Sequence, residues 1–370
     1  MTRAYDQEAA RRYAQRRYRL LLAQVVWSAA ALWAAHASGW SQAVAQWWTA
    51  RWPHPAAALL GVLATLSAAY YFVMLPLHVF GSFTLEHRFG LSRMTARAWA
   101  IKEAKQLAVS SVLGLAMVEG FFAIVSHAPS AWPLWATAAW IIVSVILARL
   151  FPTLLLPIFY KTVPLPNADL VRRLLALCRR VGLPALGVFR FDLGAETRKA
   201  NAALAGLGAT RRVLVSDTLV SEFSVEEIEG VLAHELGHHR HRHIPKQLAL
   251  ESAGTWLVLE LTRWASPWWI GACGLSGLAD PAGLPVLALW LSLVRLVGMP
   301  LHNGFSRYCE WQSDRFAIAT TTPAALAGAL RRLAALNLAD PNPPRWVVWL
   351  LYTHPPITER IRAADSAARG

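Results

Sequence analysis

The sequence predicts an all-α polytopic membrane protein, with about six transmembrane helices that enclose a chamber, and a small α+β domain containing a short β-sheet. Three observations lead to this fold class. Of the 370 residues, 55% are hydrophobic and only 16% are charged, which is too apolar for an ordinary soluble protein. Several apolar runs are long enough to cross a bilayer. Between two groups of these runs, segment 161–245 has the composition of a soluble domain.

The first domain, 1–160, carries four predicted spans and basic segments between them. The spans cover 20–35, 55–80, 107–125 and 132–156. We expect the first span to be retained, because no small-residue cleavage site closes it as in a signal peptide. An interfacial loop is expected between the first two spans, because tryptophan favours the membrane surface. Its tryptophans are Trp40, Trp47, Trp48 and Trp52.

The second domain, 161–245, alternates helical and strand-like patterns. A helix is expected near 167–182, and short strands are expected at 187–191, 201–204 and 212–215. Ser224 with Glu227 forms a predicted capping box, so a helix should begin there. Pro245 is expected to break or bend that helix before the next span.

The third domain, 246–302, carries the fifth and sixth predicted spans, at 247–268 and 284–301. A helical C-terminal region, 303–370, follows. Several spans contain ionisable residues, and Glu119 and Glu251 are the hardest to explain by snorkelling to a membrane surface. Charges at membrane depth face a bundle interior or a water-filled cavity, which is why we expect a chamber.

Basic residues outnumber acidic ones by 36 to 22, and arginines concentrate in the two termini and in segments 82–106 and 160–245. The loops at 126–131 and 265–283 contain no lysine or arginine. The positive-inside rule therefore predicts that both termini and the soluble domain are cytoplasmic. The abundance of arginine and alanine hints at a GC-rich bacterial genome, hence an inner-membrane location. No nucleic-acid-binding signature accompanies the charge, and the three cysteines suggest no disulfide framework.

The most informative motif is His234-Glu235-Leu-Gly-His238. Histidines four apart lie on one helix face, so both imidazoles can reach one metal ion while Glu235 projects toward a bound water. This is the arrangement of zinc metalloproteases, and it predicts one Zn²⁺ per chain. The alternative is a histidine-rich, solvated helix end.

A catalytic zinc needs a third protein ligand. His241, one turn further on, would have to wrap around the metal from the same helix, which geometry disfavours. Glu310 and Asp314 share a helix face downstream, so Glu310 can bind the metal while Asp314 accepts a hydrogen bond from a ligating imidazole. The alternative for both carboxylates is a salt bridge with nearby arginines. His239 and His243 lie off the ligand face of a continuous helix.

From about residue 57 onward, the chain resembles the type I CAAX prenyl protease family of integral-membrane zinc metalloproteases, relatives of the membrane heat-shock zinc proteases. Six motifs in order carry the resemblance: Phe83-Thr-Leu-Glu86-His-Arg-Phe-Gly90; Lys199-Ala-Asn201-Ala202 with Gly206; Arg212-Val-Leu-Val-Ser-Asp217-Thr-Leu; His234-Glu235-x-x-His238 with His243; Ser306-Arg-x-x-Glu310-x-x-x-Asp314; and His354-Pro-Pro-Ile-Thr-Glu-Arg360.

The resemblance implies a role for each matching residue. His234, His238 and Glu310 would bind zinc, and Glu235 would be the general base. Asp314 would orient a ligand or help in proton donation. The remaining roles concern the substrate: Asn201, Ala202 and Gly206 would hold an extended peptide by strand addition, and His354 and Arg360 would stabilise the oxyanion. Without the resemblance, a capping or packing histidine before a proline turn is the favoured interpretation of His354; with it, a site residue is favoured.

The sequence therefore predicts a membrane-embedded zinc endopeptidase that processes the C-termini of prenylated peptides or cuts related membrane substrates. A quality-control protease of the heat-shock type is the second hypothesis. A catalytically silent membrane scaffold or transporter is the third, and the intact motif argues against it because such a protein has no need of Glu235. The expected partners are a peptide or membrane-protein substrate and the lipid bilayer, with no nucleic acid.

Overall fold

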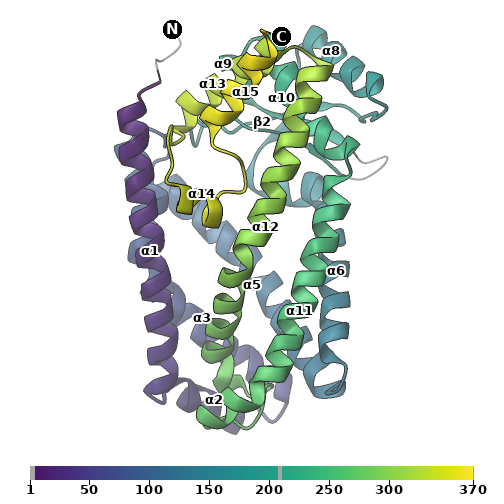
Figure 1. Cartoon of the computed structure of the whole chain (residues 1–370). Helices are drawn as coiled ribbons and strands as arrows, with labels where there is room; N and C mark the ends of the chain where they lie inside the picture. The colour runs from purple at the N-terminus through teal and green to yellow at the C-terminus, as the bar shows by residue number, and fades with distance from the viewer. Residues whose placement is uncertain (1–4, 207–210, 370) are drawn as a thin grey trace.

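A computed structural model describes residues 5–206 and 211–369 of the chain. Long helices run side by side along most of the molecule, and a small domain with a β-sheet caps one end (Figure 1). The helix α1 begins at this capped end, and the C-terminus lies there too. The two ends of the chain therefore lie on the same side of the helical layer, as the predicted six crossings would require.

Within the described residues, five continuous helical segments are long and apolar enough to cross a membrane. They contain α1 (Gln7–Ala37), α3 (Pro55–Val79), α5 (Ala96–His127), α6 (Trp132–Leu150) and α12 (Leu284–Thr320). At most 28% of the apolar window of any of them is buried within the protein. Large side chains such as Phe72, Val112 and Val297 are exposed, and a bilayer is the environment that would cover them. The predicted spans one to four and six are confirmed as helices.

The predicted fifth span lies within α11 (His243–Ala272), which is not among these five segments. Its 30 residues extend about 45 Å, so its length suffices, but its charged residues interrupt the apolar pattern. Three of these charged residues lie in two ion pairs: Glu251 Oε1 lies 2.6 Å from His302 Nδ1 of α12, and Glu260 contacts Arg263 at 2.8 Å. The helix lies beside α6 and α12 (Figure 1). The sixth crossing and the water-filled chamber stay predictions.

Three of the four interfacial tryptophans lie in a helix, which Trp52 follows, and the expectation of a loop was wrong. Trp40–Arg51 is α2, which lies across the end of the molecule opposite the small domain (Figure 1). Its twelve residues extend only about 18 Å, too short to cross a bilayer. Trp48 packs over Gly61 of α3 and donates a hydrogen bond to Thr65, which gives the segment the tertiary contacts that stabilise a helix.

Shorter helical segments continue two of the long helices at the capped end. After α3 come the π-helix η1 (Phe80–Thr84) and α4 (Leu85–Arg88), and after α6 come η2 (Phe151–Leu155) and α7 (Leu156–Phe159).

The small domain is built on a four-stranded sheet of order β1-β2-β4-β3. The strands are β1 (Thr162–Pro164), β2 (Val188–Phe191), β3 (Ala202–Ala205) and β4 (Arg212–Ser216). The last three confirm the predicted strands, whereas β1 has only three residues and no alternating pattern that would reveal it. Because β3 pairs with β4 alone, β3 is an edge strand.

Helices surround this sheet and share one hydrophobic core with it. The first are α8 (Ala168–Arg180), where a helix was predicted, and the short α9 (Asp217–Glu222). Next comes α10 (Val225–Arg240), which begins at the predicted capping box: Glu227 N donates to Ser224 Oγ at 3.2 Å and Ser224 N donates to Glu227 Oε2 at 2.8 Å. The C-terminal region adds α13 (Pro323–Asn337) and α15 (Ile357–Ala367) to this core.

Two short elements lie outside this core: α14 (Arg345–Leu351) packs on α12, and η4 (Pro281–Gly283) precedes α12 and packs on α2 and α3.

The break between α10 and α11 occurs before Pro245, not at it. Arg242 has a left-handed backbone with φ 54°, and α11 begins at His243. Pro245 therefore lies in the first turn of α11, where a backbone N–H has no intrahelical acceptor to lose. The proline is compatible with the new helix and does not cause the break.

Candidate active site

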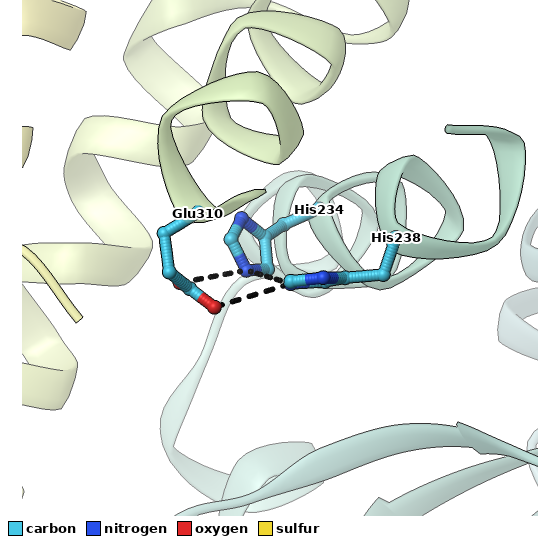
Figure 2. A group of neighbouring side chains, drawn as sticks. All are labelled: His234, His238 and Glu310. Atoms are coloured by element: carbon cyan, nitrogen blue, oxygen red, sulfur yellow. Dashed lines mark hydrogen bonds and ion pairs between the residues drawn. The ribbon is translucent and has the colours of Figure 1, made fainter. Parts of the chain in front are cut away.

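Three side chains from two helices meet at one point of the small domain. His234 and His238 extend from α10, and Glu310 extends toward them from α12 (Figure 2). The two Nε2 atoms lie 3.2 Å apart. Glu310 Oε2 lies 3.3 Å from His234 Nε2, and its Oε1 lies 3.2 Å from His238 Nε2. The structure therefore brings together the three residues that the sequence predicted as metal ligands.

The arrangement fits a metal ion. Four-coordinate zinc with nitrogen and oxygen ligands at about 2.0–2.1 Å keeps those atoms about 3.4 Å apart, close to the spacings here. Glu310 Oε2 is buried without a hydrogen-bond partner, as expected of an atom whose partner is a cation. Among the described residues, this is the one group of three His, Cys, Asp or Glu side chains able to hold a metal. His241, the other candidate for third ligand, is not part of it.

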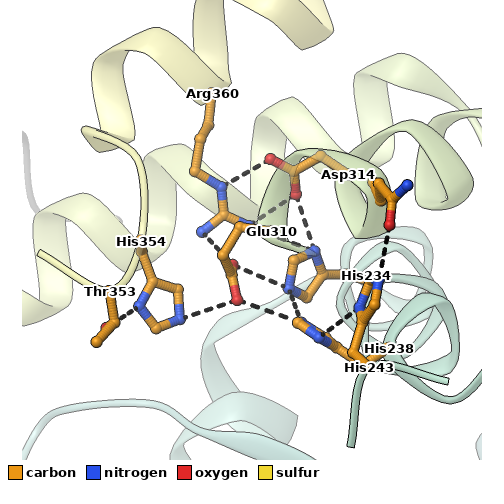
Figure 3. Close-up of polar contacts among 9 residues, drawn as sticks. His234, His238, His243, Glu310, Asp314, Thr353, His354 and Arg360 are labelled. Atoms are coloured by element: carbon orange, nitrogen blue, oxygen red, sulfur yellow. Dashed lines mark hydrogen bonds and ion pairs between the residues drawn. The ribbon is translucent and has the colours of Figure 1, made fainter. Parts of the chain in front are cut away.

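A second layer of charge surrounds His234. Its Nδ1 lies 2.8 Å from Asp314 Oδ1, and the Arg360 guanidinium donates to both Asp314 oxygens at 2.7 and 2.8 Å (Figure 3). Although burial opposes a charged ring, the hydrogen bond to Asp314 and the neighbouring Glu310 carboxylate raise the pKa of His234 to about 9. A metal ion must therefore displace a proton from this ring, which couples metal binding to pH.

Arg360 lies behind the carboxylates and is only 9% exposed. Besides Asp314, it contacts Glu310, with Nη1 3.4 Å from Oε2. Its position directs the guanidinium at the two acidic side chains. His354 is placed differently: its side chain is 59% exposed, its Nε2 lies 3.3 Å from Glu310 Oε1, and its Nδ1 lies 2.9 Å from Thr353 Oγ1.

Glu235 and the ligand His234 line a cavity of about 380 Å³. In residues 5–206 and 211–369, no side chain forms an ion pair or hydrogen bond with the Glu235 carboxylate, and burial raises its pKa above the ordinary value. A carboxylate that is close to a metal site, partly desolvated and not bonded to the protein has the properties of a general base.

The predicted substrate residues fall into two groups. Asn201 and Ala202, together with His354 and Arg360, line the same cavity as Glu235. Gly206 is not among the residues that line it: this glycine follows β3 at its far end, where its φ of 91° suits a turn. The apolar wall of the cavity comes from Leu219, Val231 and α13.

The free edge of β3 faces away from β4. Ser216 N donates to Asn201 O, so the alternation of an antiparallel pair turns the N–H and C=O of Ala202 and Leu204 outward. Leu204 O accepts a hydrogen bond from His239 Nε2 at 2.9 Å, which confirms its outward direction. The outward N–H and C=O of Ala202 lie at the cavity end of the strand.

Two histidine contacts near the site could not be predicted from the sequence. His239 connects α10 to the edge strand, and His243 Nδ1 lies 3.1 Å from His238 Nδ1. The contact of His239 with Leu204 has no signal in the sequence, because a histidine on an exposed turn can have many partners. The second depends on the left-handed residue Arg242, since on a continuous helix His243 would point about 140° away from His238.

The chain matches two family models. Residues 164–368 match Peptidase family M48, and residues 3–161 match the model described as CAAX prenyl protease N-terminal, five membrane helices. Within that N-terminal match, the structure has four segments long and apolar enough to span a membrane, in the part it describes, and α2 is the additional short helix.

Curated proteins and a solved structure give the same result. CAAX prenyl protease 1 of Saccharomyces cerevisiae is 29% identical over 326 residues, covering 83% of this chain and 71% of the relative. The uncharacterized metalloprotease YhfN of Bacillus subtilis is 27% identical over 333 residues, covering 89% and 78%. The crystal structure of S. mikatae Ste24p matches with a TM-score of 0.77 at 27% identity, covering 84% of this chain and 76% of that one.

The fold, the spanning helices and the ligand cluster agree with these matches. With more than half of its length matched by the family model, the chain belongs to peptidase family M48, and it is an integral-membrane metallopeptidase.

Proposed function

We propose that the protein is a zinc-dependent endopeptidase that cuts peptides or membrane proteins at the membrane surface. His234, His238 and Glu310 would hold one Zn²⁺, since two imidazoles and one carboxylate are a donor set typical of catalytic zinc. The observation that carries this proposal is the convergence of the two Nε2 atoms and the two Glu310 oxygens, at 3.2–3.3 Å, beside the cavity that Glu235 lines.

When bound, zinc would acidify a water molecule and polarise the scissile carbonyl. The chain's own residues would supply the proton transfers and the orientation. Glu235 accepts the proton of the attacking water and passes it to the leaving amine, a role for which its raised pKa is suited. Asp314, itself held by Arg360, fixes the His234 ring with Nε2 toward the ligand group.

His354 and Arg360 have different parts in this proposal. His354 is exposed at the cavity and points Nε2 toward the ligand group, so it can donate to the oxyanion that forms during attack. The guanidinium of Arg360 is bonded to Asp314 and close to Glu310. Arg360 would therefore stabilise the oxyanion indirectly, by positioning these carboxylates and by its positive charge at the site.

The substrate would lie along β3 as an added strand. The outward N–H and C=O of Ala202 provide one pair of main-chain hydrogen bonds at the cavity, and Asn201 lies beside them. Gly206 would end the binding edge, because the chain turns there. Leu204 O is engaged by His239, which leaves the Ala202 end as the part of the edge that is available.

The physiological substrate would be a prenylated peptide C-terminus or a related membrane protein, in line with the names of the CAAX prenyl protease relatives. Damaged membrane proteins are the second candidate class, as in quality control. The experiment compares three fluorogenic substrates with purified protein: a prenylated CAAX peptide, the same peptide without its lipid, and an unfolded membrane-protein segment. Chelation should abolish cleavage and Zn²⁺ should restore it; cleavage that survives complete metal removal would overturn the proposal.

We place the catalytic domain and both chain ends on the cytoplasmic side of a bacterial inner membrane, with domains 1–160, 161–245, 246–302 and 303–370. The basic segments and the common location of the chain ends support this orientation. A reporter fused after Ala279, in the loop before α12, should be extracytoplasmic. A cytoplasmic signal there would contradict the topology.

A further inference from the structure

We infer that His243 is a positioning residue for the metal ligand His238, and that Gln312 and Tyr308 of α12 fix its orientation through an uncharged relay of hydrogen bonds. The inference rests on the proposed zinc function and deepens it. His243 is 1% exposed, and its two ring nitrogens both have partners.

The relay consists of three contacts in series. His238 Nδ1 lies 3.1 Å from His243 Nδ1, and His243 Nε2 lies 2.8 Å from Gln312 Oε1. Gln312 Nε2 donates to the Tyr308 hydroxyl at 2.9 Å. The order from the ligand outward is therefore imidazole, imidazole, amide and phenol, and none of these groups is a carboxylate. Figure 3 shows its first step, from His238 to His243.

Metal binding determines the direction of every hydrogen bond in this series. His238 presents Nε2 to the ligand group, so a neutral His238 carries its proton on Nδ1 and donates it to His243 Nδ1. His243 must then carry its own proton on Nε2, and the acceptor facing that proton is Gln312 Oε1. The opposite amide orientation would place the Gln312 NH₂ group against His243 Nε2. His243 would then carry its proton on Nδ1, and the proton of His238 would be forced onto Nε2, the nitrogen that faces the metal.

The backbone is shaped to make this contact. A residue five positions after His238 would point about 140° away on a continuous helix. The left-handed conformation of Arg242 ends α10, and α11 then begins with His243 turned back toward His238. A left-handed conformation is strained at a residue other than glycine, and such strain is retained where the surrounding structure requires it.

The two histidine ligands would therefore be held by chemically different partners. His234 donates to a carboxylate that is itself paired with Arg360, whereas His238 donates to a neutral imidazole. An imidazole acceptor orients the ligand without adding negative charge to a site that already contains Glu310, Glu235 and Asp314. Asp314 and His243 would each orient one ligand, and only Asp314 would contribute negative charge.

The experiment measures zinc affinity by chelator competition on purified full-length protein, with thermal unfolding of the metal-free form as a second readout. His243→Leu removes the acceptor at similar size, and His243→Asn keeps an oxygen close to the position of Nδ1. We expect His243→Leu to bind zinc about 10–100-fold more weakly and His243→Asn to recover most of the loss. His241→Leu is the matched control, because His241 stacks on His243 without a hydrogen bond to either ligand.

We expect the metal-free wild type and the metal-free His243→Leu variant to unfold at similar temperatures. A merely structural role of His243 would instead lower the unfolding temperature of the metal-free variant along with its zinc affinity. If His243→Leu does not fold, Gln312→Leu and Gln312→Glu replace it. Gln312→Leu removes the acceptor for His243 Nε2 and should weaken zinc binding. Gln312→Glu keeps this acceptor and should bind zinc more tightly than Gln312→Leu.

An affinity of His243→Leu, or of Gln312→Leu, within twofold of the wild type would overturn the inference. The proposed function fails separately, if the wild-type protein binds no stoichiometric zinc or if Glu310→Gln leaves its affinity unchanged.

Discussion

Gly237 of α10 lies directly against the backbone of Ser313 of α12. A Cβ built on this glycine would lie 2.9 Å from the Ser313 Cα, closer than side chains tolerate. Gly237 lies between the ligands His234 and His238, and Ser313 lies between Glu310 and Asp314. The close approach of the two helices therefore sets the distance between the two halves of the metal site.

Gly237→Ala should push α10 away from α12 and weaken zinc binding. Overpacking of this kind costs about 1–3 kcal/mol, and here the displaced atoms carry the ligands. Gly254→Ala in α11 is the matched control, because nothing lies within 4 Å of a Cβ there. Zinc titration and thermal unfolding of both variants provide the measurement. Unchanged affinity in Gly237→Ala would show that the helix spacing does not limit the site.

Glu310→Gln should lose zinc while keeping the fold. The amide has the same shape, but it lacks the negative charge that a third ligand supplies, and Glu310 Oε2 has no hydrogen bond to the protein that an amide would lose. Metal analysis of the purified variant is the measurement. Wild-type stoichiometry would assign the third ligand to another residue.

Asp314→Asn should weaken zinc binding by about 10–100-fold, because it removes the charge that accepts the His234 Nδ1 proton and leaves the buried Arg360 with fewer ionic partners. The pH dependence should also change. Asp314 and Glu310 raise the pKa of His234 to about 9, so protons compete with metal below that pH, and the variant should show weaker competition. Zinc affinity measured between pH 6 and 9 tests both effects; identical pH profiles would count against this role of Asp314.

Ala202→Pro should raise KM for a peptide substrate by about three- to tenfold, the effect of one lost main-chain hydrogen bond. Proline removes the outward N–H of Ala202, and an edge strand tolerates it there because that N–H does not pair with β4. Ala202→Gly keeps the N–H and should cleave with a KM close to that of the wild type. Equal KM values for all three proteins would rule out strand addition at this residue.

Much of this architecture was predictable because its signals are local. The capping box at Ser224 marks the start of α10, and the four-residue spacing within each pair placed His234 with His238 and Glu310 with Asp314 on one helix face. The strands around the edge of the cavity also follow from short apolar runs.

What could not be predicted depends on tertiary contacts. The left-handed backbone at Arg242 has no sequence signal, because arginine does not favour that conformation, and the position of His243 follows from it. The packing of Trp48 over Gly61 makes α2 a helix where composition alone suggested a loop. The need for glycine at position 237 also has no local signal, because it follows only from the packing of α12 against α10.

The central claim is that Glu235 is the general base of a zinc peptidase, and Glu235→Gln tests it most directly, with Glu226→Gln as the control from the exposed first turn of the same helix. The measurement is peptide cleavage together with zinc content. We expect Glu235→Gln to keep full zinc and lose about 10²–10⁴-fold in kcat, while Glu226→Gln retains activity. Cleavage at the wild-type rate by zinc-loaded Glu235→Gln would contradict the account.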